Sequence, residues 1–205
     1  MAYKNLKKSV IFLLLLFFCI KSYPQETKTV VNKIPSLAIN SNLLYDATTS
    51  MNLGLEFKLN NTSTFKLPVT YNPWTFDNDK KGKFVLVQPE WRWWLCEAFT
   101  GHFIGIHAHY AFYNVGGIQN VLSIPLSDYM SNHRFQGWLA GAGLTYGYQF
   151  YLAPRWSLEA SLGIGYAYLD YGMYYCEECG KLISRENKNY FGLTQAGISL
   201  IYFVK

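Results

Sequence analysis

The feature that most constrains this 205-residue chain is a two-residue alternation between apolar residues and small or polar ones. The stretch "RWSLEASLGIGYAYLD" at 155–170 shows it clearly, because every second residue from Trp156 to Tyr168 is apolar. Successive side chains of a β-strand point to opposite faces, so this period is typical of a strand with one apolar face. What lies against that apolar face decides the fold.

The same alternation recurs along the chain and predicts eight strands. The connections between them alternate in length, and the long ones are 75–83, 114–134 and 169–189. Short turns at one end and long loops at the other are typical of outer-membrane β-barrels, and an even strand count brings both chain ends to the same side. The predicted strands are 36–45, 51–59, 65–74, 84–95, 102–113, 137–151, 155–170 and 190–204.

The N-terminus has the layout of a secretory signal peptide. Three lysines precede an apolar run over 10–20, which is too short to span a bilayer as a helix. We therefore expect a signal peptide over 1–22, a periplasmic segment over 23–35 and the barrel over 36–205. Removal of the signal peptide takes away four lysines and lowers the formal net charge from +5 to about +1 (5 − 4). The basic balance thus reflects targeting and does not indicate nucleic-acid binding.

The small face of the strands separates two all-β alternatives. In a soluble β-sandwich or lipocalin-like barrel, the apolar face forms the core and the other face is solvated. Here the other face is rich in glycine, including Gly141, Gly143 and Gly163, which suits the crowded interior of a narrow barrel. Aromatic residues make up 18% of the chain, and those near strand ends fit interfacial girdles. The sequence favours an eight-stranded antiparallel transmembrane β-barrel of the cell outer membrane.

Charged residues on the small face are predicted to lie in the interior of this barrel. Side chains just fill the interior of an eight-stranded barrel, and charges there must be paired. We expect an ion-pair network that seals the barrel, with a narrow proton or ion path as the alternative. Two histidines at i and i+2 share this face, and no third ligand accompanies them, so hydrogen-bonded histidines are favoured over a metal site. The predicted polar network comprises Glu56, Lys58, Lys66, Glu90, Arg92, His107, His109 and Glu159.

The motif "CEECG" places Cys176 and Cys179 in the last outside loop. In an oxidising compartment this spacing favours a local disulfide, and half of a zinc site or a redox pair are the alternatives. A complete zinc site needs four ligands, and only Cys96 remains, in a turn at the opposite end. The sequence therefore predicts no metal and no other cofactor.

Several motifs carry a resemblance that covers nearly all of the predicted mature chain. They are "NLLYDATTSMNLGLEF", "YNPWTF", "VQPEWRWWLCEAFTGHFIGIHAHY", "YNVGG", "GAGLTYGY" and "CEECG". With them the chain resembles a family of Bacteroidetes outer-membrane proteins, the domain-of-unknown-function 3575 family. The resemblance implies an outer-membrane barrel and an association with cell-surface structures, in some cases fimbriae. It implies no catalytic residues.

These observations predict a small, closed, non-enzymatic barrel that serves envelope structure or cell-surface interaction. The alternatives are a lipid-modifying enzyme of the acyltransferase or deacylase type and a narrow conduit. The expected partners are outer-membrane lipid, the barrel assembly machinery, and surface or fimbrial proteins that meet the outside loops.

Overall fold

The computed structural model describes residues 35–75, 81–116, 120–121, 124–125, 133–175 and 181–204. The chain divides into two units, Met1–Lys33 and Ile34–Lys205, and all described residues belong to the second. The predicted signal peptide, nearly all of the predicted periplasmic segment and both cysteines of the predicted loop disulfide, Cys176 and Cys179, lie outside the described residues. No helix in the described part of the chain is long and apolar enough to cross a membrane.

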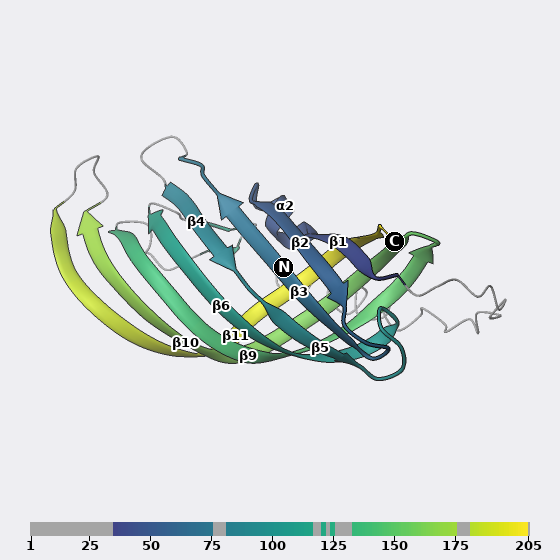
Figure 1. Ribbon diagram of the computed structural model, residues 1–205. Coiled ribbons are helices and arrows are strands. Elements are labelled where there is room, and N and C mark those ends of the chain that lie inside the picture. Colours follow the sequence, from purple (N-terminus) through teal and green to yellow (C-terminus); the bar gives the residue numbers. More distant parts are fainter. Residues whose placement is uncertain are drawn as a thin grey trace, which may run out of the picture. The chain divides into compact units, whose positions relative to one another are not determined.

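Antiparallel strands dominate this unit and close into a ring (Figure 1). Nine of the strands form one sheet, and the ring closes because β1 pairs with both β2 and β11. Strands β7 and β8 pair with each other in a separate hairpin. The elements are β1 (Leu37–Asn42), α2 (Leu43–Ala47), β2 (Met51–Lys58), β3 (Ser63–Asn72), β4 (Lys81–Val87), β5 (Glu90–Trp94), β6 (Gly101–Gly116), β7 (Asn120–Val121), β8 (Ile124–Pro125), β9 (His133–Ala153), β10 (Trp156–Tyr175) and β11 (Leu182–Phe203).

Strands β4 and β5 share one position in the ring, since both pair with β3 on one side and β6 on the other. They were predicted as one strand over 84–95, and the structure interrupts that strand at Gln88 and Pro89. Proline has no N–H to donate to a strand ladder. Its carbonyl still accepts from the Ala108 N–H at 3.0 Å, so the path around the ring continues across the break. The ring therefore has the eight positions that the alternation predicts.

The strands of the ring are strongly tilted. Following paired positions from Ala38 of β1 through the successive strands leads to Gly192 of β11, whereas Ala38 itself pairs with Phe203, eleven residues further along β11. The offset includes one bulge residue, Thr194. With about 3.3 Å per residue and about 4.8 Å between strands, this offset over eight positions corresponds to a tilt of roughly 43°.

The first strand is shorter than predicted. The alternation predicts a strand over 36–45, but β1 ends at Asn42 and the short helix α2 follows. Asn42 is the N-cap of α2, and its side-chain oxygen accepts a hydrogen bond from the Leu44 N–H at 3.1 Å. An asparagine at this position satisfies a backbone donor that the helix cannot, which favours a helix start over a continued strand.

The last two strands are longer than predicted. The segment 169–189 was predicted as an outside loop, but β10 and β11 stay paired from Trp156–Tyr202 to Tyr174–Leu182. Figure 1 shows β9, β10 and β11 as long curved strands beside the shorter β1 and β2. Over residues 182–189, both faces of β11 are exposed and carry polar residues. The sequence therefore has no two-residue period there, although the pairing with β10 continues.

Polar and apolar side chains are distributed in the opposite way to a soluble protein. Among outward-facing residues, Leu53 is 59% exposed and Phe191 is 78% exposed, whereas Glu56, Arg92 and Glu159 in the interior are fully buried. A solvated surface tolerates single apolar residues, but these continue from strand to strand around the ring. The interior of the ring thus holds the charges, and its exterior is apolar.

A small apolar cluster closes the interior at the end with the short turns. The Trp94 ring lies 4.9 Å from that of Phe103, and the Phe99 ring lies 5.4 Å from that of Phe203, measured between centroids. Ile201 is fully buried in the same cluster. These side chains lie below the buried charges and separate them from the turns.

Candidate functional site

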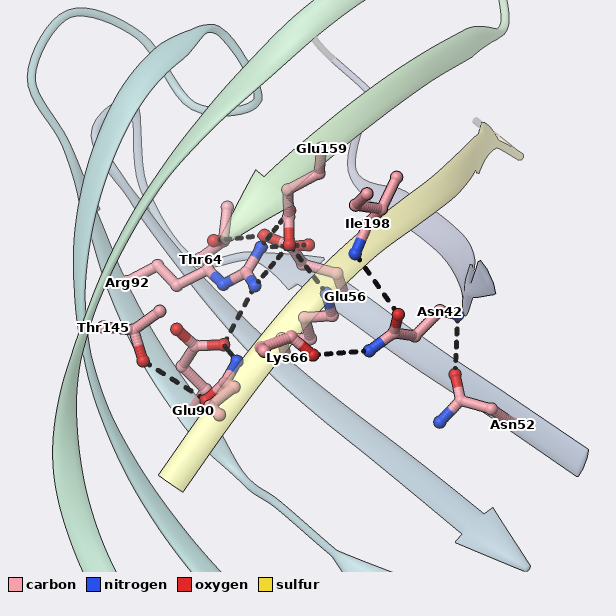
Figure 2. A network of polar contacts seen from close by, with 12 residues as sticks. Asn42, Asn52, Glu56, Thr64, Lys66, Glu90, Arg92, Thr145, Glu159 and Ile198 are labelled. Atoms are coloured by element: carbon pink, nitrogen blue, oxygen red, sulfur yellow. Dashed lines mark hydrogen bonds and ion pairs between the residues drawn. The ribbon is translucent and has the colours of Figure 1, made fainter. Parts of the chain in front are cut away.

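Arg92 lies at the centre of a buried network of charges (Figure 2). Its Nη1 donates to Glu56 Oε2 at 3.1 Å and to Glu159 Oε2 at 2.7 Å. Its Nη2 donates to Glu90 Oε2 at 2.9 Å and to Glu159 Oε1 at 3.0 Å. The guanidinium thus binds Glu159 in a bidentate manner while it joins three carboxylates from β2, β5 and β10.

Neutral groups and a second cation complete the network. Lys66 Nζ contacts Glu159 Oε1 at 3.1 Å. The Thr64 hydroxyl donates to Glu56 Oε1 at 2.6 Å and accepts from the Trp94 indole N–H at 3.0 Å. Since buried charges are tolerated only when they are paired and hydrogen-bonded, each of these contacts lowers the cost of placing carboxylates inside the ring.

Lys58 does not join the network, although it was predicted with the other charges. It is only half-buried, near the end of β2, and no described carboxylate lies within ion-pair distance of it. Three carboxylates and two cations, Lys66 and Arg92, therefore make up the network, which leaves a formal charge of −1 (2 − 3). The sequence pattern predicted equal numbers of each sign.

The two predicted histidines lie above the network and differ in their partners. His107 is fully buried between two hydroxyls, with Nδ1 2.7 Å from Thr145 Oγ1 and Nε2 2.9 Å from Thr194 Oγ1. His109 is also buried, with its ring centroid 5.6 Å from that of His107, but its Nδ1 has no hydrogen-bond partner among the described residues. The pair does not share a ligand-like geometry.

Glutamine links the histidine region to the charges. Thr145 Oγ1 donates to Gln195 Oε1 at 3.2 Å, and Gln195 Nε2 donates to Glu90 Oε2 at 3.2 Å. A chain of hydrogen bonds therefore runs from His107 through Thr145 and Gln195 to Glu90 and Arg92. Each link fixes the orientation of the next polar group in a space without bulk water.

Inward-facing glycines make room for these side chains. A Cβ at Gly163 would lie 2.9 Å from Cε1 of His107, which is closer than side-chain carbons approach each other. A Cβ at Gly143 would lie 2.7 Å from the same atom. The glycines on the small face are thus needed where the imidazole crosses the interior.

A cavity of about 630 Å³, lined by both polar and apolar residues, lies toward the end with the long loops. Its lining includes Asn72, Tyr113 and Asp170. At its rim, Arg185 Nη2 pairs with Asp170 Oδ1 at 3.1 Å, and both side chains are more exposed than any in the buried network. Described residues therefore leave a recess open to solvent above the region that the charges fill.

Metal ligation finds no support in the described ranges, which contain no group of three or more His, Cys, Asp or Glu residues placed to hold an ion. Cys96 is exposed and unpaired within the same ranges. The predicted disulfide between Cys176 and Cys179 stays a prediction, because both lie outside the described residues.

Over residues 10–204, the sequence matches the family described as protein of unknown function (DUF3575). The chain belongs to this family. Neither a curated protein nor a solved structure matches it. The DUF3575 assignment agrees with the motif resemblance, but its description names no reaction, ligand or membrane.

The alternation located the charged members of the site but not their neutral partners. Glu56, Lys66, Glu90, Arg92 and Glu159 all occupy inward positions and meet in one network. The sequence did not single out Thr64, Thr145 or Gln195, which hold the carboxylates and His107 in place. Their only signal was an inward position in the two-residue period, which does not reveal which strands meet across the ring.

Proposed function

We propose that the chain is a small β-barrel of the cell outer membrane, preceded by a signal peptide over 1–22, that serves envelope structure or cell-surface interaction without enzymatic activity. The observation that carries this proposal is the apolar exterior around a charged interior. In water such an arrangement would expose a continuous hydrophobic surface, whereas in a bilayer it places apolar side chains against lipid and hides the charges.

The dimensions of the strands support a membrane location. Backbone groups in a lipid-facing sheet need partners, and pairing around the ring provides them along the laddered part of each strand. A tilt of about 43° matches that of transmembrane barrels, in which about 9–11 residues per strand suffice to cross the bilayer. Strands β9, β10 and β11 have 21, 20 and 22 residues, so their ends near the long loops extend beyond the membrane.

Aromatic side chains at both ends of the exterior support the same location. Tyr110, Trp138 and Tyr168 lie in a row toward the long loops, with centroid separations of 6.2 and 5.7 Å. Trp156 and Tyr202 pair at 4.9 Å near the short turns. Tryptophan and tyrosine favour the two membrane–water interfaces, because one end of the ring system is apolar and the other is polar.

The buried network favours a closed barrel over a conduit. Arg92 and its carboxylates fill the interior above the apolar cluster of Trp94 and Phe103. Ions moving through this region would have to replace well-made ion pairs. The strand ends and loops beyond the membrane are the surface available for contacts with fimbria-like or other surface assemblies.

A lipid-modifying enzyme is the second candidate, because the His107 imidazole lies next to the Thr194 hydroxyl. Hydroxyl nucleophiles need an imidazole base that a third group orients. His107 meets the Thr194 hydroxyl, but its other ring nitrogen contacts Thr145, and no described carboxylate hydrogen-bonds to it. This arrangement supports a structural histidine.

Deletion of the gene and complementation with the full chain test this function. We expect altered surface assembly or adhesion in the deletion strain, an unchanged lipid A mass, and recovery of the full chain from the outer-membrane fraction. Replacement of residues 122–130 by a Gly-Ser linker should fail to restore the surface phenotype, whereas Asn60→Ala in a turn at the opposite end should restore it. A changed lipid A mass would favour the enzyme, and recovery from the soluble periplasm would exclude the barrel.

A further inference from the structure

The wall of the ring is incomplete on one side. Strand β11 pairs with β1 only over five positions, from Ala38–Phe203 to Asn42–Ser199. Beyond Asn42, the helix α2 takes the place of a strand, and the edge of β11 toward Leu182 has no partner strand among the described residues. The ladder that closes the ring thus ends partway along β11.

Asn42 marks the end of the closed part of the wall. Its side-chain oxygen accepts from the Ile198 N–H at 3.3 Å, and its Nδ2 donates to the Ala196 carbonyl at 3.1 Å (Figure 2). Its backbone N–H in turn donates to Asn52 Oδ1 at 2.8 Å. One asparagine side chain therefore replaces the missing strand pairs. The residues of β11 that precede Ala196, toward Leu182, border an opening in the wall.

Two adjoining cavities lie at this opening. The outer cavity, of about 360 Å³, lies between Leu44 and Tyr45 of α2 and the β11 edge. The inner cavity, of about 380 Å³, shares Leu193 and Thr194 with it. Volumes in this range hold small ligands. Together the two cavities form a passage from the side of the ring into its interior.

Three leucines line the inner cavity together with polar residues that include Gln88 and Lys188. Leu86 comes from β4, Leu139 from β9 and Leu169 from β10. None of these leucines belongs to the buried charge network. They offer an apolar surface against which the methylene groups of a hydrocarbon chain are favourably buried.

One histidine that lines the inner cavity has a polar atom without a partner among the described residues. His109 lines this cavity, is 5% exposed, and its Nδ1 makes no hydrogen bond to any described residue. A buried polar atom without a hydrogen-bond partner destabilises the protein, because it has lost its contacts with water. A lipid acyl group provides both parts that the cavity lacks, a hydrocarbon chain for the leucines and an oxygen for the imidazole.

The exterior beside the opening is apolar. Leu193 is 51% exposed and Phe191 is 78% exposed, and both lie on the outward face of β11. Leu43 and Leu44 of α2 are 41% and 37% exposed across the opening. The passage therefore opens onto the surface that, under the proposed function, contacts lipid, on the side nearer the long loops.

We propose that the inner cavity binds the acyl chain of a membrane lipid, which passes sideways between α2 and β11. The proposal rests on the membrane location inferred above. The chain can come from a phospholipid, from lipopolysaccharide or from a free fatty acid, because all three present the same hydrocarbon and acyl oxygen.

Photocrosslinking in intact outer membranes tests the proposal with the full chain. A genetically encoded diazirine residue is placed at Leu139, which lines the inner cavity, at Leu144, which is 58% exposed on the same strand, or at Ile201, in the apolar cluster at the other end. We expect lipid adducts at 139 and 144, with several-fold more at 139 than at 201. The adduct mass distinguishes phospholipid, lipopolysaccharide and fatty acid.

Two further variants test the route and the folding. Ala196→Phe narrows the outer cavity and should lower the adduct at 139 several-fold without changing that at 144, whereas the outward Ala142→Phe should change neither. The diazirine at Leu86 of β4, which also lines the inner cavity, repeats the measurement if the residue at 139 prevents heat-modifiable migration, the mark of a folded barrel. Adducts at 144 but at neither 139 nor 86 would overturn the cavity assignment. A full yield at 139 in Ala196→Phe would overturn the sideways route, and no adduct at 144 would overturn the membrane location itself.

Discussion

An arginine side chain offers N–H donors in fixed directions, and both Nη atoms of Arg92 donate to carboxylates from three strands. Its guanidinium also lies 4.2 Å above the Phe103 ring, which joins the network to the apolar cluster. Removal of a single member of such a network leaves opposite charges buried without a partner. For that reason individual residues, rather than the total number of ion pairs, determine how much stability the interior contributes.

Arg92→Met should lower the free energy of unfolding by about 3–5 kcal/mol, since Glu56, Glu90 and Glu159 then remain buried without their common cation. Urea titration of the chain folded in lipid vesicles measures the change. Lys58→Met is the matched control and should cost less than about 1 kcal/mol, because Lys58 is half-buried and outside the network. Equal losses for the two variants would mean that the network does not stabilise the fold.

At the scale of elements, the alternation predicts the eight strand positions and which residues face inward. It fails where a local preference or the surroundings change. Asn42 starts a helix by capping it, and Pro89 interrupts a strand. The polar end of β11 has no apolar face, so the period that marks a strand elsewhere is missing from residues such as Arg185 and Lys188. The sequence predicts that the charged residues of the site face inward. It does not predict which of them form ion pairs, because that depends on the register of the strands around the ring.

Asn42→Ala should loosen the junction of α2, β1 and β11. The variant removes the cap of α2 and the acceptor of the Ile198 N–H, at a cost of about 0.5–2 kcal/mol. Hydrogen exchange at the Ile198 amide should become faster by the corresponding factor. Asn60→Ala is the control, since it removes a similar local bond to the Thr62 N–H at the other end of the ring. Unchanged exchange at Ile198 would show that Asn42 does not hold the wall.

At the scale of the whole molecule, the distribution of residues is that of a ring turned inside out, with an apolar belt, a charged interior and a recess toward the long loops. In our proposal the two halves of the ring have different functions. The sealed half contains the buried network around Arg92, and the open half contains the unpaired edge of β11. The buried network and the aromatic cluster block passage through the ring, whereas the unpaired edge of β11 admits lipid from the side.

The sealed half predicts that the folded chain conducts no ions. In planar bilayers we expect no sustained channel openings of porin size at moderate voltages, because Arg92, Glu159 and Phe103 fill the interior. A porin added to the same bilayer verifies that openings are detectable. Reproducible openings of porin size from the purified protein would contradict the closed barrel and favour a conduit.

Two adjacent tryptophans report where the apolar exterior lies. Trp93 is 44% exposed on the outward face of β5, and Trp94 is 3% exposed in the interior. The test uses lipid vesicles with brominated acyl chains, which quench nearby tryptophans. A protein variant whose only tryptophan is Trp93 should lose most of its fluorescence, and a variant whose only tryptophan is Trp94 should lose little. Strong quenching at 93 and weak quenching at 94 is the predicted result. Unquenched emission from Trp93, in a chain that stays dissolved and folded without detergent, would contradict the transmembrane barrel.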